Sequence, residues 1–181
     1  IGFAVGELGT ISKTSDAGSN WSTFILPNEV NDKLESVYFT SANVGYIVGE
    51  FGRLFKTTNG GESWTVININ FINSDIVFNS VNFISDETGY IVGSSGKILK
   101  TSNEGIDWTQ LSAGTNYVGL FSVFFTNQNT GYVVGSQETI MKTVNAGATW
   151  TILYGAGGAS SLIYNSIFFT DDNTGYIVGE L

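Results

Sequence analysis

Apolar residues in this sequence gather in short runs that are separated by polar turns. Residues 36–40 read SVYFT and residues 45–49 read GYIVG. Both runs are almost continuously apolar and rich in β-branched and aromatic residues, which is typical of strands in a sheet covered on both faces. No apolar run repeats with the 3.6-residue period of a helix. The pattern therefore predicts an all-β protein.

The apolar runs belong to a unit that is repeated along the chain. The glycine that begins GYIVG stands at positions 2, 45, 89, 131 and 175, so the unit returns every 42 to 44 residues. This period, with four strand-like runs in each unit, predicts a β-propeller built from four-stranded antiparallel blades of about 43 residues. A β-solenoid or a two-sheet sandwich is the alternative, but a sandwich would leave one face of each strand polar.

Each blade is expected to hold four strands, A to D, joined by short hairpin turns. In the second blade they fall at residues 36–40, 45–49, 53–57 and 64–69. The chain holds five copies of strand B and four of each other strand, so a closed four-blade ring would leave one strand B unplaced. We therefore expect an open arc of about four blades of a larger ring, with further blades of the same protein. The predicted blades are a partial first blade at 1–26, blades at 36–69, 80–111 and 122–153, and a partial last blade at 166–181.

Charge and composition narrow the function classes. The net charge is −9 and only 13% of residues are charged, which argues against nucleic acid and anionic membrane surfaces, because both require clustered Lys and Arg. No run of 18 apolar residues predicts insertion into a membrane. The low charge with many Asn, Ser, Thr and Gly favours an exported protein, extracellular, cell-surface or periplasmic. Without Cys or His, no Cys–His or Ser–His nucleophile pair can form within these residues, and we expect no metal site and no cofactor.

A second pattern, Thr-x-Asx-x-Gly-x-x-Trp, repeats at the turn between strands C and D. An Asp or Asn side chain accepts backbone N–H bonds in its own turn, glycine supplies a positive φ, and tryptophan places a large ring against the blade. Because the pattern occurs four times, we interpret it as a structural element of the fold. Its residues are Asp16, Gly18, Trp21, Asn59, Gly61, Trp64, Asn103, Gly105, Trp108, Asn145, Gly147 and Trp150.

This turn pattern resembles the Asp-box, or BNR repeat, [ST]-x-D-x-G-x-x-W, with Asn in place of Asp in three copies. Together with the GYIVG strand, it resembles the photosystem II stability and assembly factor family over essentially the whole chain. The resemblance implies a propeller whose Asp-box turns lie on the face opposite the usual binding surface. The family's assembly role is not carried over, because the resemblance ties that role to an arginine-rich surface, whereas this chain is acidic and has the single arginine Arg53.

Asp-box propellers also include glycan-cleaving enzymes. Resemblance to the sialidases implies three arginines around the substrate carboxylate, and this segment has one. A glycosidase with two carboxylates would need an Asp/Glu pair roughly 5–10 Å apart. Its candidates would be Glu7, Asp32, Glu50 and Asp75, but no spacing in the sequence pairs them. We therefore predict no catalytic residues and no enzyme activity.

A lysine ends strand C in each copy. We expect its stem to lie along the sheet, with the ammonium group in water or near a neighbouring carbonyl. A ring of cations that binds an anion is the alternative. The four residues are Lys13, Lys56, Lys100 and Lys142.

The connections between blades vary in sequence and length while the blades do not, and variable connections on a rigid scaffold usually carry binding. They span residues 27–35, 70–79, 112–121 and 154–165, and the candidate ligand contacts in them are Phe71, Tyr117, Tyr154 and Tyr164. We predict a non-catalytic binding or scaffold propeller whose partner is a protein or a glycan. The alternatives are part of a glycoside hydrolase or carbohydrate-binding propeller, and a structural unit of an extracellular assembly.

Overall fold

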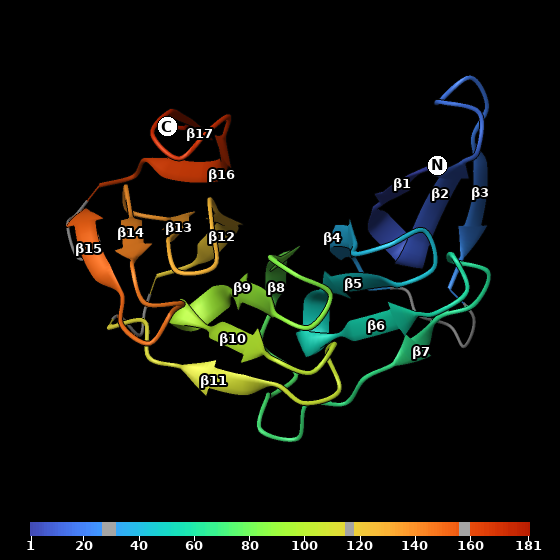
Figure 1. Cartoon of the computed structure of the whole chain (residues 1–181), viewed down its shortest axis with the longest axis horizontal. Coiled ribbons are helices and arrows are strands. Elements are labelled where there is room, and N and C mark those ends of the chain that lie inside the picture. The colour runs from blue at the N-terminus through green and yellow to red at the C-terminus, as the bar shows by residue number, and fades with distance from the viewer. Residues whose placement is uncertain (27–31, 115–117, 156–159) are drawn as a thin grey trace. The chain divides into compact units, whose positions relative to one another are not determined.

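The computed structural model describes residues 1–26, 32–114, 118–155 and 160–181 (Figure 1). Within these residues, the regular structure is five antiparallel sheets and three short 3₁₀ turns. No helix in the described ranges is long and apolar enough to cross a membrane. The chain divides into two compact units, Ile1–Phe78 and Asn79–Leu181, which are described separately.

The first unit contains two sheets. One is the three-stranded sheet β1 (Gly2–Val5), β2 (Thr10–Thr14) and β3 (Ser22–Ile25). The other is the four-stranded sheet β4 (Leu34–Phe39), β5 (Gly45–Gly49), β6 (Leu54–Thr57) and β7 (Thr65–Val66). Each strand pairs with its neighbour in sequence, as a row of hairpins requires.

The second unit contains three sheets, the first of which begins one residue before the unit, at Phe78. It consists of β8 (Phe78–Phe83), β9 (Gly89–Gly93), β10 (Ile98–Thr101) and β11 (Thr109–Leu111). The next holds β12 (Leu120–Phe125), β13 (Gly131–Gly135), β14 (Ile140–Thr143) and β15 (Thr151–Tyr154). The last pairs β16 (Ile163–Phe169) with β17 (Gly175–Glu180), so the fifth copy of strand B forms beside its own strand A.

The B strands explain why the apolar runs are continuous. Every residue of β5 and of β9 is buried, so both faces of these strands are covered. In four of the five copies, the glycine that begins strand B lies beneath the phenylalanine ring of the paired A strand. A Cβ atom added to Gly45 would come within 2.7 Å of the Phe39 ring, and one added to Gly131 within 2.6 Å of the Phe125 ring. A larger residue would displace the ring that closes the hairpin.

The outer strands differ from the sequence-based prediction. Strand D of the second blade, expected at residues 64–69, is reduced to β7, Thr65–Val66. Both residues of β7 are exposed, and the amide of Ile67 still donates to the carbonyl of Leu54 before the chain leaves the sheet. An outer strand with one solvated face has little apolar burial to extend its pairing.

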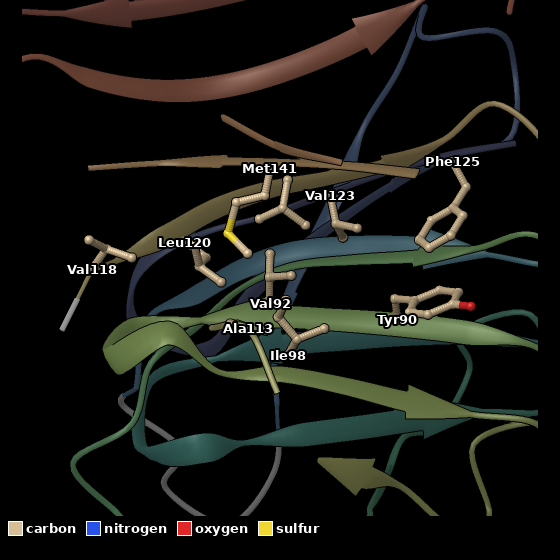
Figure 2. Packing of buried hydrophobic residues seen from close by; sticks show 10 residues of the cluster. Tyr90, Val92, Ile98, Ala113, Val118, Leu120, Val123, Phe125 and Met141 are labelled. Atoms are coloured by element: carbon tan, nitrogen blue, oxygen red, sulfur yellow. The ribbon is translucent and has the colours of Figure 1, made fainter. Parts of the chain in front are cut away.

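Each unit has its own apolar core. In the first unit, Ile11, Leu34, Ile47 and Phe55 are buried in one cluster with Leu26. Figure 2 shows the core of the second unit, where Leu120, Val123 and Met141 point from one blade toward Val92 and Ile98 of the preceding blade. The four-stranded blades therefore pack sheet against sheet, which confirms the predicted all-β architecture of propeller blades.

Candidate functional site

The Asp-box turn of the second blade is closed by its own side chains. The buried Thr57 hydroxyl accepts the amides of Asn59 and Gly61 at 3.3 and 3.0 Å and donates to Asn59 Oδ1 at 2.9 Å. Asn59 Oδ1 also accepts the amide of Ser63 at 3.0 Å, and Asn59 Nδ2 donates to Ser63 Oγ at 3.0 Å. Both polar groups of the Asn59 side chain therefore form hydrogen bonds within the turn.

The same bonds recur in the other three turns and explain why Asn can replace Asp. One side-chain oxygen accepts the amide four residues later in every copy, and either residue type supplies that oxygen. The second side-chain atom differs in role. Asp16 Oδ2 accepts from Asn20, whereas Asn103 donates from Nδ2 to the Asp107 carboxylate at 3.0 Å. The donor and acceptor are exchanged between the two positions of the pair.

The four Asp-box tryptophans are not equivalent. Trp108 is only 6% exposed, and its Nε1 donates to the carbonyl of Gly105 at 3.2 Å. Trp64 and Trp150 are half-buried, and within the described residues their Nε1 atoms are buried without a hydrogen-bond partner. Trp21 is 49% exposed. The expected packing of the ring against the blade core is therefore strongest at Trp108 and weakest at Trp21.

Two of the lysines at the ends of the C strands, Lys13 and Lys100, link successive blades, one in each unit. Lys13 Nζ donates to the carbonyl of Gly60 at 2.8 Å and pairs with Glu62 at 2.7 Å, which lowers the pKa of the Glu62 carboxyl. Lys100 Nζ donates to the carbonyl of Ala146 at 2.9 Å. Both acceptors lie in the Asp-box turn of the next blade, so these two lysines have the neighbouring-carbonyl role expected from the sequence.

Hydrogen bonds between turns assign them to two ends of each blade. At one end, the Asp-box turn contacts the A–B turn: the amide of Gly60 donates to Asn43 and that of Ala146 to Asn129. We call this the Asp-box end. At the opposite end, the B–C turn contacts the connection to the next blade: the amide of Gly52 donates to the carbonyl of Ile76. We call this the variable end.

The B–C turns repeat the contact with the connection in both units. The amide of Gly9 donates to Asp32, and that of Gly96 to Val118, at 2.9 and 2.7 Å. Short 3₁₀ turns carry these amides, and the residue before the glycine has a positive φ, as at Phe51 with φ 56°. The variable connections are therefore fixed to rigid hairpins at their base.

The candidate ligand contacts at the variable end differ in how exposed their side chains are. Phe71 in the first unit is 49% exposed, and Tyr154 at the end of β15 in the second unit is 55% exposed. Tyr164 is half-buried within β16 and pairs with Gly179. Tyr117 lies outside the described residues. Phe71 and Tyr154 thus keep the exposure that a contact residue needs.

Sequence reasoning missed Phe51. Its side chain is 52% exposed, and it lines a shallow groove of about 240 Å³ with Arg53, Ile67 and Ile72. The groove lies beside the connection that carries Phe71. The signal in the sequence is a large apolar residue inside a tight turn, EFG, where hydrophobic burial would not place one.

Three of the four carboxylates considered for glycoside cleavage, Glu7, Asp32 and Glu50, are engaged by cations or amides. Arg53 Nε lies 3.0 Å from Asp32 Oδ2, and Glu50 Oε2 accepts the amide of Lys33 at 3.0 Å. Lys33 Nζ lies 3.1 Å from Glu35 and 3.9 Å from Glu7, and these carboxylates raise the pKa of the lysine. In the described residues, no three His, Cys, Asp or Glu side chains group as a metal site would require.

Comparison with known proteins identifies relatives of the fold. The family model described as photosynthesis system II assembly factor YCF48 matches residues 1–71 and 20–120. This match confirms the resemblance inferred from the repeated motifs. A comparison with curated proteins found no match.

Three solved structures are similar to the chain over 98% of its length. YCF48 bound to a D1 peptide is 16% identical with a TM-score of 0.53, and 84% of that chain is covered. An ancestral GH74 enzyme is 20% identical with a TM-score of 0.75, and the GH74 enzyme of Niastella koreensis is 18% identical with a TM-score of 0.69. The chain spans 25% and 34% of these two enzymes. At such identities the similarity shows the fold alone, and it confirms a β-propeller.

Proposed function

The chain belongs to the family of the photosynthesis system II assembly factor YCF48, and from this premise we propose that it is a non-catalytic propeller module that binds a protein partner at its variable end. The observation that carries the proposal is the exposure of large aromatic residues there. Phe51 and Phe71 are 52% and 49% exposed in the first unit, and Tyr154 is 55% exposed in the second. Exposed aromatics on rigid elements are typical anchors of protein interfaces.

A peptide is the form of partner that the proposal favours. One of the similar solved structures is that of YCF48 bound to a D1 peptide. We do not propose that this chain binds its partner through a basic surface, because its net charge is −9 and Arg53 forms an ion pair with Asp32. An apolar peptide that inserts between Phe51 and the exposed connection would need few charges. We extend the proposal to an exported protein, extracellular, cell-surface or periplasmic, on its composition.

A carbohydrate-binding or glycoside hydrolase propeller is the second candidate, favoured by the TM-scores of the two GH74 enzymes. It requires two carboxylates that face a sugar. Glu50 and Asp32 instead hold a backbone amide and a guanidinium. This engagement favours the protein-binding function over glycan cleavage.

The two candidates are separated by direct binding measurements on the chain. Peptides are selected from a displayed random 12-residue library, and their dissociation constants are compared with that of a soluble β-glucan by calorimetry. The proposal expects a saturable peptide complex, no heat from the β-glucan and no release of reducing sugar. Saturable β-glucan binding, or reducing sugar released from it, would reject the proposal in favour of the second candidate.

A further inference from the structure

The three Asp-box turns that contain asparagine differ in the residue that follows it. Asn59 precedes Gly60, whereas Asn103 precedes a glutamate and Asn145 precedes an alanine. The turns otherwise share their central bonds: Oδ1 accepts the hydroxyl of the threonine two residues before it and the amide four residues after it. The three asparagines therefore form an internal comparison, in which the following residue and the partner of Nδ2 vary.

An asparagine followed by glycine can cyclise, because the amide nitrogen of the glycine can attack the carbonyl carbon of the asparagine side chain. A Cβ atom on the following residue crowds that nitrogen, and glycine has none. The attack moves negative charge onto Oδ1, and hydrogen-bond donors that already point at this oxygen stabilise the charge. Asn59 Oδ1 receives two such donors, the buried Thr57 hydroxyl at 2.9 Å and the Ser63 amide at 3.0 Å.

The two reacting groups differ in their accessibility. Asn59 is exposed, so water can reach its side chain and ammonia can leave. Gly60 is buried, and its amide donates to the carbonyl of Asn43 at 2.8 Å. This bond must open before the nitrogen can attack, so its opening limits the rate in the folded chain. The amides at positions 104 and 146 are held in the same way by their own A–B turns, so this bond does not distinguish the three sites.

We propose that Asn59 is a site of spontaneous deamidation in the folded chain. The Gly60 nitrogen forms a bond to Cγ of Asn59, the bond between Cγ and Nδ2 breaks, and Nδ2 leaves as ammonia with the proton of the Gly60 amide. Water then opens the succinimide ring. Cleavage between Cγ and the nitrogen gives aspartate, and cleavage at the backbone carbonyl carbon gives isoaspartate. Both products add negative charge at the Asp-box end, away from the partner site proposed at the variable end.

The turn can accommodate the aspartate product. Asn59 Nδ2 donates to Ser63 Oγ at 3.0 Å, and a hydroxyl can donate as well as accept. An aspartate at this position can therefore accept from Ser63, as the Asp16 carboxylate accepts from its partner in the first turn. Asn103 differs, because its Nδ2 donates to the Asp107 carboxylate, which can only accept. Isoaspartate inserts a methylene group into the backbone and would disrupt the bonds of the turn.

The test uses the intact 181-residue chain, incubated in mildly alkaline buffer below its unfolding temperature. Mass spectrometry of proteolytic peptides, with electron-transfer fragmentation, separates aspartate from isoaspartate. Conversion at Asn59 is expected to be at least about tenfold faster than at Asn103 and Asn145. Hydroxylamine, which cleaves succinimides, should divide the folded chain between residues 59 and 60. Gly60→Ala should lower the rate at Asn59 to that at Asn145, which already precedes an alanine.

Two results would overturn the proposal, and neither requires a variant to fold. One is equal conversion at the three asparagines of the wild-type chain. The other is no conversion at Asn59 in the folded chain, whether or not the chain unfolded in urea converts.

The fit of the product is tested by two matched variants. At neutral pH, Asn59→Asp should unfold at nearly the temperature of the wild type, because Ser63 can donate to the new carboxylate. Asn103→Asp should unfold at a lower temperature, because it places two carboxylates together. Equal losses in the two variants would show that the second turn does not accommodate aspartate and would overturn that part of the proposal.

Discussion

Asn20 holds Asp16 through both its backbone and its side chain: the amide of Asn20 donates to Asp16 Oδ1 at 2.9 Å, and Asn20 Nδ2 donates to Asp16 Oδ2 at 2.7 Å. A third bond comes from the Thr14 hydroxyl at 2.8 Å. These donors favour the charged carboxylate and lower the pKa of Asp16 from 3.8 to about 2. The first Asp-box turn therefore depends on an ionised group, whereas the other three use a neutral Asn.

This difference predicts a pH dependence confined to the first turn. Because the folded-state pKa of Asp16 is depressed, its stabilising contribution is present above about pH 4 and is lost as pH falls toward about 2. Thermal unfolding of the wild type and of Asp16→Asn should be compared from pH 7 to pH 2. The amount by which the unfolding temperature of the wild type exceeds that of Asp16→Asn should shrink between pH 4 and 2. A constant difference over that range would show that the carboxylate does not titrate as the geometry requires.

Tryptophan substitutions should differ by position even though the motif is the same. Trp108→Ala removes a ring that is 6% exposed and donates to Gly105, and it should lower the free energy of unfolding by about 3–5 kcal/mol. Trp21→Ala, at a ring that is 49% exposed, should cost less than about 1 kcal/mol. Urea unfolding curves measure both. Equal losses at the two positions would contradict the packing described for the motif.

The glycine at the start of strand B should tolerate no side chain. Gly131→Ala places a methyl group 2.6 Å from the Phe125 ring and should destabilise the chain by about 1–3 kcal/mol through overpacking. Gly6→Ala is the matched control, since its Cβ would meet nothing within 4 Å and its φ of −167° is extended, and it should change stability by less than about 0.5 kcal/mol. Thermal unfolding should separate the two variants, and a neutral Gly131→Ala would refute the role of the ring.

The sequence predicts the inner strands closely because their signal is strong. The repeat predicts strand B at residues 45–49, and β5 is Gly45–Gly49. A β-branched run between two glycines has no competing helical pattern, and burial on both faces fixes its ends. The repeat overestimates strand D, because the exposed residues of β7 have no apolar burial to hold them in the sheet.

Other features could not be read from the repeat because they depend on neighbouring residues or chain position. Asn20 and Asp107 stand at a position of the motif where any residue is allowed. Only the folded turn shows that the side chain of each forms a hydrogen bond with the Asp or Asn four residues before it. The exposure of Phe51 depends on a positive φ at a non-glycine residue. Trp21 has the same motif as Trp108 but is 49% exposed rather than 6%, and it lies beside a three-stranded sheet rather than a four-stranded one.

The central claim, that the variable end binds a protein partner, is tested most directly by calorimetric titration of a peptide selected against the wild-type chain. Two double variants with similar exposed apolar area are compared: Phe51→Ser/Phe71→Ser at the variable end and Ile106→Ser/Val144→Ser at the Asp-box end. The first pair should weaken binding at least about tenfold, as the loss of aromatic anchors does, with an unchanged unfolding midpoint. The second pair should bind as the wild type does. Loss of binding in the Asp-box pair, with full binding retained in the variable-end pair, would contradict the account.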